Sequence, residues 1–246
     1  MPAPGLILAA PASGAGKSVL TLAIARALKS RGINVGLAKS GPDYIDAGFH
    51  AAASGRASTN LDAWAMPAPM LRDLAERAGQ RAELVLCEGA MGLFDGVLED
   101  GRAERGSTAE LAELLGWPVV LLLDLRGQGA SAAAVARGFM THRPAVAIMG
   151  VIGNRVASPR HAALLRAALK ELPVPLLGLV PRDARLALPE RHLGLVQARE
   201  HAALDAFLDS AAALIAEVID LDALVALARP TPRPVGSATH LPRLGQ

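Results

Sequence analysis

Cysteine is almost missing from this chain of 246 residues, because Cys87 is the only one. A single cysteine excludes an internal disulfide and any zinc or iron–sulfur site built from several thiolates. This usage suits a reducing compartment, and we expect a cytoplasmic protein. Cys87 itself lies inside an apolar run with no histidine near it in the sequence. That position favours a small buried side chain over a nucleophile.

Aromatic residues are also few, at 3% of the chain, which leaves little to stack against nucleic-acid bases. The chain has 25 Lys and Arg against 23 Asp and Glu, spread along its length, so its net charge of +2 implies no polyanionic partner. Apolar runs such as 119–123 are far short of the roughly 20 residues that cross a bilayer. We therefore expect neither a nucleic-acid partner nor a membrane.

What the chain does have is 52% hydrophobic and 20% charged residues, enough to bury a sizeable core. Short β-branched or leucine-rich runs alternate with amphipathic helical patterns, which is typical of βαβ units around a mostly parallel sheet flanked by helices. We therefore predict an α/β fold. The predicted strands are 6–9, 35–39, 84–88, 119–124, 146–152 and 176–180, and the predicted helices are 19–30, 70–78, 108–115, 132–141, 159–171 and 204–218. Residues 1–228 are expected to form one domain, followed by a Pro-rich tail over 229–246.

The sharpest motif follows the first predicted strand and opens the first predicted helix. Residues 11–18 read Pro-Ala-Ser-Gly-Ala-Gly-Lys-Ser, and the end of this segment is typical of a loop that binds nucleotide phosphates. Glycines let backbone N–H groups face the phosphates, Lys17 reaches the β- and γ-oxygens, and Ser18 can ligate Mg²⁺. Pro11 departs from the general motif, which has glycine there. The alternative is a glycine-rich turn with a surface lysine, and the strand–loop–helix context favours the phosphate loop.

A second group of polar residues begins at the carboxyl end of the second predicted strand. Lys39, Asp43 and Asp46 lie here, and Gly41-Pro42 forces a turn between them. A turn or short helix would aim both aspartates the same way, and two carboxylates beside a triphosphate can hold Mg²⁺. Either aspartate alone would suit an Asx turn or a helix cap. The pair beside Lys39 favours a functional role.

The third predicted strand ends in Glu88, as a strand carrying an acid of the Walker B type would. Its loop contains further glycines and Asp95, so the backbone can pass close to a ligand. Asp124 ends the next strand and is a rival that spacing alone does not exclude; it would also suit a helix cap. The six histidines show no spacing typical of metal ligands.

These motifs together closely resemble the cobyrinic/hydrogenobyrinic acid a,c-diamide synthase family of cobalamin biosynthesis. Two blocks are the most specific in combination: Gly-Pro-Asp-Tyr-Ile-Asp, within 39–50, and Cys-Glu-Gly-Ala-Met-Gly, within 87–96. Supporting blocks lie at 13–18, 106–110, 153–155 and 181–195, and the resemblance extends to about Val196.

The resemblance implies a P-loop NTPase fold similar to that of dethiobiotin synthetase. It also implies ATP-dependent amidation of the a- and c-acetate carboxylates of a corrin polycarboxylate, cobyrinic or hydrogenobyrinic acid, with Mg²⁺ as cofactor. An acyl phosphate makes chemical sense as the intermediate, because a carboxylate has no usable leaving group until it is phosphorylated.

Carried onto this chain, the resemblance assigns a role to each matching residue. It assigns the nucleotide to Ser13, Gly14, Ala15, Gly16, Lys17, Ser18, Val19, Asn154 and Arg155, with Asn154 reading the base. It assigns Mg²⁺ to Ser18 and Glu88 with one of Asp43 or Asp46, of which we take Asp46. Catalysis would involve Lys17, Lys39, Asp43, Asp46 and Glu88. The corrin would face Tyr44, His50 and Asp95.

Full-length members of this family also carry a C-terminal glutaminase domain with a cysteine nucleophile, and Cys87 does not suit that role. We therefore expect the nitrogen to come from free ammonia or from a separate glutaminase, or else the sequence is truncated. The alternatives are the related nickel-tetrapyrrole a,c-diamide synthase and a partitioning-type regulatory ATPase with a deviant phosphate loop. The second class has lysine where this chain has Ala12. The sequence is compatible with a homo-oligomer and does not determine the oligomeric state.

Overall fold

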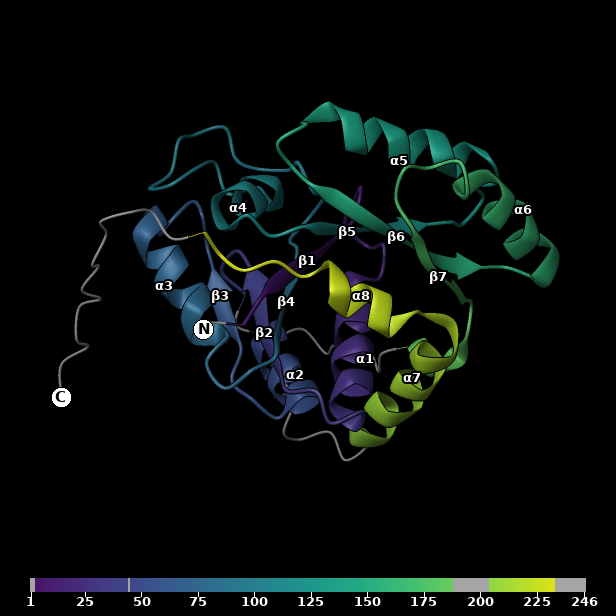
Figure 1. Cartoon of the computed structure of the whole chain (residues 1–246), viewed down its shortest axis with the longest axis horizontal. Coiled ribbons are helices and arrows are strands. Elements are labelled where there is room, and N and C mark those ends of the chain that lie inside the picture. Colours follow the sequence, from purple (N-terminus) through teal and green to yellow (C-terminus); the bar gives the residue numbers. More distant parts are fainter. Residues whose placement is uncertain (1–2, 44, 188–203, 233–246) are drawn as a thin grey trace.

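A seven-stranded parallel sheet forms the centre of the protein, in the order β3-β2-β4-β1-β5-β6-β7 (Figure 1). The computed structural model describes residues 3–43, 45–187 and 204–232. The strands are β1 (Gly5–Ala9), β2 (Val35–Ser40), β3 (Thr59–Leu61), β4 (Leu84–Glu88), β5 (Val119–Asp124), β6 (Ile148–Val156) and β7 (Leu176–Pro181).

Helices cover both faces of this sheet (Figure 1). On one face lie α1 (Lys17–Ser30), α2 (Ile45–Ser54), α7 (Leu204–Val218) and α8 (Leu221–Leu227). On the other lie α3 (Ala68–Ala78), α4 (Thr108–Leu115), α5 (Ser131–His142) and α6 (Pro159–Leu169). Alternation along the strands supplies both cores: Leu6 and Leu8 pack on the first face, and Ile7 and Ala9 on the second. A parallel sheet buried on both faces explains why the strands read as apolar runs.

The predicted α/β fold is confirmed, including its parallel sheet and most of its elements. Four short elements are absent from the predicted list, namely α2, β3, α8 and the 3₁₀ helix η1 (Ala184–Leu186). The three residues of β3 are too few to show any periodicity, and Gly48 interrupts the helical pattern of α2. The strand predicted over 146–152 instead runs from 148 to 156, so that Asn154 lies within β6.

The chain stays packed against the domain beyond residue 228. Arg229 and Gly5 form an antiparallel bridge, with N···O distances of 2.8 and 3.0 Å. The indole N–H of the buried Trp117 donates to the Thr231 hydroxyl at 3.0 Å. These contacts fix the described end of the chain at the start of β1 and β5. The last fourteen residues of the predicted tail, 233–246, lie outside the described residues.

Within the described ranges, no helix has the length and apolar content needed to cross a bilayer.

Candidate active site

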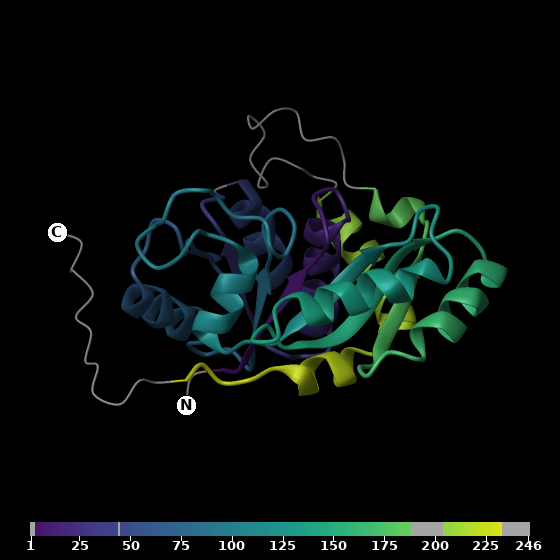
Figure 2. The same ribbon diagram turned by 90° about the horizontal axis from the view of Figure 1, so that it is seen from above.

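The loops that follow β1, β2 and β4 meet at the carboxyl edge of the sheet, where open parallel sheets bind their ligands. They surround a cavity of about 550 Å³, lined by residues 13–14, 16–19, 39–43, 46, 88–91 and 155. Figure 2 shows the loop before α1 and the start of α2 along this same edge. The edge therefore brings together all three segments that the sequence singles out.

The phosphate loop has the backbone that its glycines predict. Gly14 and Gly16 adopt φ values of 75° and 98°, in the left-handed region that favours glycine. Gly16 is also the residue that precedes α1, and a Cβ there would lie 2.5 Å from Nδ2 of Asn154. Only glycine fits this position. The amino end of α1 consequently opens onto the cavity with its free N–H groups, an arrangement suited to anionic phosphate.

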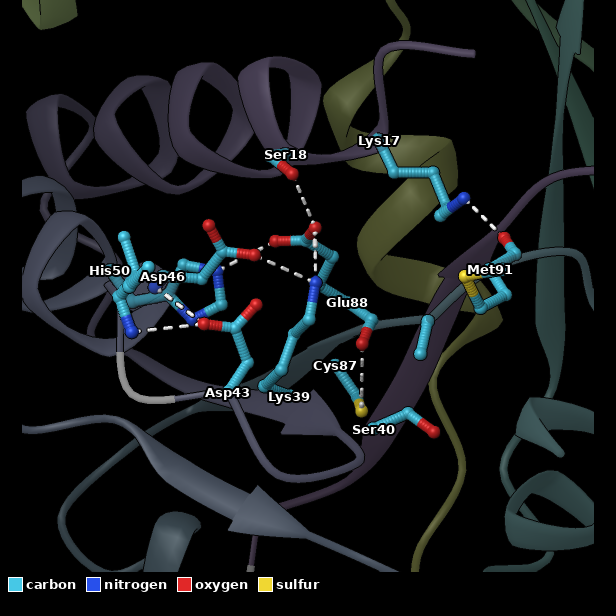
Figure 3. Close-up of polar contacts among 12 residues, drawn as sticks. Lys17, Ser18, Lys39, Ser40, Asp43, Asp46, His50, Cys87, Glu88 and Met91 are labelled. Atoms are coloured by element: carbon cyan, nitrogen blue, oxygen red, sulfur yellow. Dashed lines mark hydrogen bonds and ion pairs between the residues drawn. The ribbon is translucent and has the colours of Figure 1, made fainter. Parts of the chain in front are cut away.

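Lys17 reaches across this loop to two backbone carbonyls. Its ammonium donates to the carbonyl of Ala12 at 3.2 Å and, in a short contact, to that of Met91 (Figure 3). Burial lowers the pKa of Lys17, and the charge of nearby Lys39 acts in the same direction, while Glu88 opposes them. Met91 itself has φ 45°, so a strained residue presents this acceptor. Lys17 is thus held at the wall of the cavity.

Glu88 is the centre of the site, fully buried at the end of β4. Its Oε1 accepts hydrogen bonds from the Ser18 hydroxyl at 2.6 Å and from the Lys39 ammonium at 2.7 Å. Its Oε2 lies 2.8 Å from Nε2 of His50 (Figure 3). Burial by itself would raise the pKa of Glu88, but the His50 hydrogen bond and the Lys39 charge outweigh it, so this pKa lies below its ordinary range. Glu88 is therefore held as a carboxylate.

Lys39 joins Glu88 to the second motif. Its ammonium also lies 2.8 Å from Oδ2 of Asp46, and both side chains are almost fully buried. Burial alone would lower the pKa of Lys39. The two carboxylates raise this pKa by a larger amount, so the net shift is upward. Asp43 has a different place: its Oδ1 accepts from the backbone N–H groups of Ile45 and Asp46, both at 2.9 Å. Asp43 thus caps the start of α2 while lining the cavity.

Two of the three residues that the resemblance assigns to the corrin lie away from the cavity wall. His50 is 1% exposed, and its ring nitrogens lie beside Glu88 and the Ser58 hydroxyl. The contact of His50 with the corrin stays a prediction. Asp95 is exposed, and its carboxylate accepts from the Gly92 N–H at 2.7 Å, which ties the loop after β4. Tyr44 lies outside the described residues.

A second cavity, of about 370 Å³, adjoins the first on the β6 and β7 side. Asn154 and Arg155 line it, and Arg155 lines both cavities. Nδ2 of Asn154 donates to the Ala15 carbonyl at 2.8 Å, which fixes the amide beside the phosphate loop. Arg155 donates to the Gly14 carbonyl at 2.8 Å and pairs with Asp124 at 2.6 Å. Asp124 thus supports Arg155, whereas Glu88 is the acid that contacts the phosphate loop.

The residues present fit a magnesium ion bound together with a nucleotide. Ser18, Asp46 and Glu88 offer oxygen atoms, the donors that Mg²⁺ prefers, and all three side chains reach the same wall of the cavity. In the part of the chain that the structure describes, no three His, Cys, Asp or Glu side chains form a ready ion-binding cluster. Phosphate oxygens would therefore have to complete the coordination, as is usual for Mg²⁺.

Sequence reasoning missed two parts of this site. Ser58 contacts His50, and nothing in its sequence surroundings indicates this. The Met91 carbonyl that holds Lys17 could not be found either, because a backbone acceptor has no sequence signal. The common orientation of Asp46 and His50 could have been predicted, because a spacing of four places both on one face of a helix once α2 is recognised.

Comparison with known sequences places this geometry in a family. The family model for the CobQ/CobB/MinD/ParA nucleotide binding domain matches residues 6–196. The hydrogenobyrinate a,c-diamide synthase of Rhodobacter capsulatus is 54% identical over 98% of this chain and 55% of that protein. The hydrogenobyrinate a,c-diamide synthase of Mesorhizobium japonicum is 49% identical over 100% of this chain and 56% of that protein. The chain thus spans about half the length of the curated relatives it matches.

Solved structures with a similar fold include two of the signal recognition system. FtsY from Elizabethkingia anophelis has a TM-score of 0.52 at 17% identity, over 85% of this chain and 64% of that one. The 54 kDa protein from Aeropyrum pernix has a TM-score of 0.50 at 20% identity, over 91% and 50%. At such identities the likeness shows the fold alone. With the phosphate loop, Lys39 and Glu88 all inside the matched range, the chain belongs to the CobQ/CobB/MinD/ParA nucleotide-binding domain family.

Proposed function

We propose that this chain is the ATP-dependent synthetase part of a hydrogenobyrinate a,c-diamide synthase. It would convert the a- and c-acetate carboxylates of hydrogenobyrinic or cobyrinic acid to amides. The observation that supports this most is the pair of contacts on Oε1 of Glu88, 2.6 Å from Ser18 and 2.7 Å from Lys39. One carboxylate thereby joins the phosphate loop to the Gly-Pro-Asp-Tyr-Ile-Asp motif. The proposed substrate is taken from the names of the similar proteins.

The proposed reaction has two steps. A corrin carboxylate oxygen attacks the γ-phosphorus of ATP, the bond from that phosphorus to the bridging oxygen breaks, and ADP leaves. The product is an acyl phosphate, whose phosphate can depart where oxide could not. Ammonia then attacks the acyl carbon, phosphate leaves with its electron pair, and the nitrogen loses a proton to give the amide.

The residues of this chain would act mainly by charge and position. Backbone N–H groups of the phosphate loop and the Lys17 ammonium would bind the β- and γ-phosphates, and Lys39 would neutralise charge on the transferring group. Ser18, Asp46 and Glu88 would hold Mg²⁺, which when bound supplies charge neutralisation on the β- and γ-phosphate oxygens. Asn154 would read the base in the 370 Å³ cavity, with Arg155 between base and phosphates.

Ammonia would reach this site from a glutaminase or from solution. Releasing it from glutamine needs a reactive thiolate, and the thiol of Cys87 does not suit that task. Cys87 is fully buried within β4, and burial raises its pKa to about 12. We accordingly expect no glutamine hydrolysis by Cys87.

The test is incubation of the chain with Mg-ATP, an ammonium salt and each candidate tetrapyrrole, followed by mass analysis. We expect hydrogenobyrinic or cobyrinic acid to exchange two hydroxyl groups for amino groups, with one ADP formed per amide. Glu88→Gln serves as the inactive control. Amidation of a nickel tetrapyrrole alone would assign a different substrate. ATP hydrolysis that needs no tetrapyrrole and yields no amide would overturn the proposal in favour of a regulatory ATPase.

A further inference from the structure

His50 is a buried polar residue for which the proposed reaction has no direct use. It lies in the second turn of α2, four residues after Asp46, so both side chains project from the same side of the helix toward β4. It is 1% exposed and does not line the 550 Å³ cavity, whereas Asp46, Lys39 and Glu88 do. A bulky substrate in that cavity would meet those three residues, and His50 lies behind them.

The two carboxylate oxygens of Glu88 have different partners, and His50 is the partner of Oε2. Oε1 receives Ser18 and Lys39, at 2.6 and 2.7 Å, on the side of the phosphate loop. Oε2 has His50 at 2.8 Å on the side of α2 (Figure 3). Without His50, a buried carboxylate oxygen would lose this partner, and the carboxylate could rotate away from Ser18.

Ser58 contacts the other ring nitrogen of His50. Its hydroxyl lies 3.0 Å from Nδ1 of His50 and 3.3 Å from the Leu37 carbonyl, and it has one proton to give. If Ser58 donates to Nδ1, a neutral imidazole carries its proton on Nε2. If Ser58 donates to Leu37, Nδ1 donates to Ser58 and the ring carries a proton on both nitrogens. Because the Glu88 carboxylate can only accept a hydrogen bond, Nε2 carries the proton that points at it in both arrangements.

We propose that His50 is a positioning residue that acts through Glu88. It holds Oε2 so that Oε1 is presented to Ser18 and to a magnesium ion bound with the nucleotide, and Ser58 holds the imidazole in turn. The inference rests on the magnesium–nucleotide site of the proposed function and not on the identity of the tetrapyrrole. It replaces the substrate contact that the resemblance implies for this residue. Partners of this kind in other proteins change metal affinity by about 10- to 100-fold when they are removed.

The experiment measures Mg²⁺ binding without any tetrapyrrole. Mg²⁺ is titrated calorimetrically into the chain saturated with a non-hydrolysable ATP analogue, for the wild type, His50→Leu and His50→Gln. We expect His50→Leu to weaken Mg²⁺ binding by about 10- to 100-fold. His50→Gln, whose amide can still donate to Glu88, should recover most of the loss. His142→Leu, the same change at an exposed histidine of α5, should bind as the wild type does.

Other outcomes would overturn the inference. These are an unchanged Mg²⁺ affinity in His50→Leu, or a loss of affinity that His50→Gln does not restore. If His50→Leu does not fold, Ser58→Ala takes its place, with a smaller loss expected in the same direction and an unchanged affinity counting against the inference. Because no tetrapyrrole is present, a failure of amidation would contradict the proposed function and leave this result standing.

Discussion

The ammonium of Lys39 lies 2.7 Å from Oε1 of Glu88, and both side chains are almost completely removed from solvent. Such a pair costs desolvation energy on both sides, and its gain depends on good geometry and on further hydrogen bonds. Asp46, Ser18 and His50 supply those bonds. The pair therefore links the second strand to the fourth at the point where a nucleotide would bind.

Removing the cation alone should destabilise the fold, because two buried carboxylates would lose their counter-ion. Lys39→Met should lower the free energy of unfolding by about 3–5 kcal/mol, as measured by urea denaturation. The double variant Lys39→Met/Glu88→Gln should lose less than the sum of the two single variants, since it leaves one carboxylate fewer without a partner. Additive losses would show that the two side chains do not interact.

Acid should weaken the fold through Glu88. The pKa of this carboxyl lies below its unfolded value, which is about 4.3, so the unfolded chain takes up a proton before the native chain does. The stability from Glu88 is therefore complete above the unfolded pKa and is lost as the pH falls toward the folded one. Glu88→Gln should give a lower free energy of unfolding at pH 7 and a flatter decline below pH about 4.3. An acid limb unchanged by this substitution would contradict the assignment.

Cys87 should be inert while the protein is folded. Burial raises its pKa to about 12, and its side chain has no solvent exposure. At pH 8 a thiol reagent should modify none of the native protein and one thiol per chain in denaturant. Rapid labelling of the native chain would restore Cys87 as a candidate nucleophile.

The two lysines of α1 should differ sharply in their effect on ATP turnover. Lys17→Ala removes the ammonium at the phosphate loop and should lower kcat by about 10²–10³-fold with the fold retained. Lys29→Ala, at the exposed end of the same helix, should leave turnover unchanged. Steady-state ATP consumption with the tetrapyrrole present measures both. Equal activity in the two variants would remove Lys17 from the phosphate site.

The fold and the phosphate loop could be predicted because their signals are local. The apolar run of a buried parallel strand and the Gly-rich turn before a helix each occupy fewer than ten consecutive residues. The surroundings of Glu88 could not be predicted in this way. Ser18, Lys39 and His50 lie 70, 49 and 38 residues from it along the chain, and only the strand order brings them together.

His50 shows most clearly what could not be predicted from the sequence. A histidine in a motif that resembles a substrate-binding segment is naturally assigned to the substrate. Its surroundings in the structure depend on helix α2, whose register buries His50 together with Asp46. The position of Asp43 also depends on α2. Because this helix begins at Ile45, Asp43 lies two residues before it and caps its first N–H groups.

Oxygen transfer tests the proposed chemistry most directly. The tetrapyrrole is prepared with ¹⁸O in its acetate carboxylates and incubated with the chain, Mg-ATP and ammonium, and the released phosphate is analysed by mass. If the carboxylate attacks the γ-phosphorus, each amide formed should place one ¹⁸O atom in inorganic phosphate. Amide formation with unlabelled phosphate would contradict activation by phosphoryl transfer.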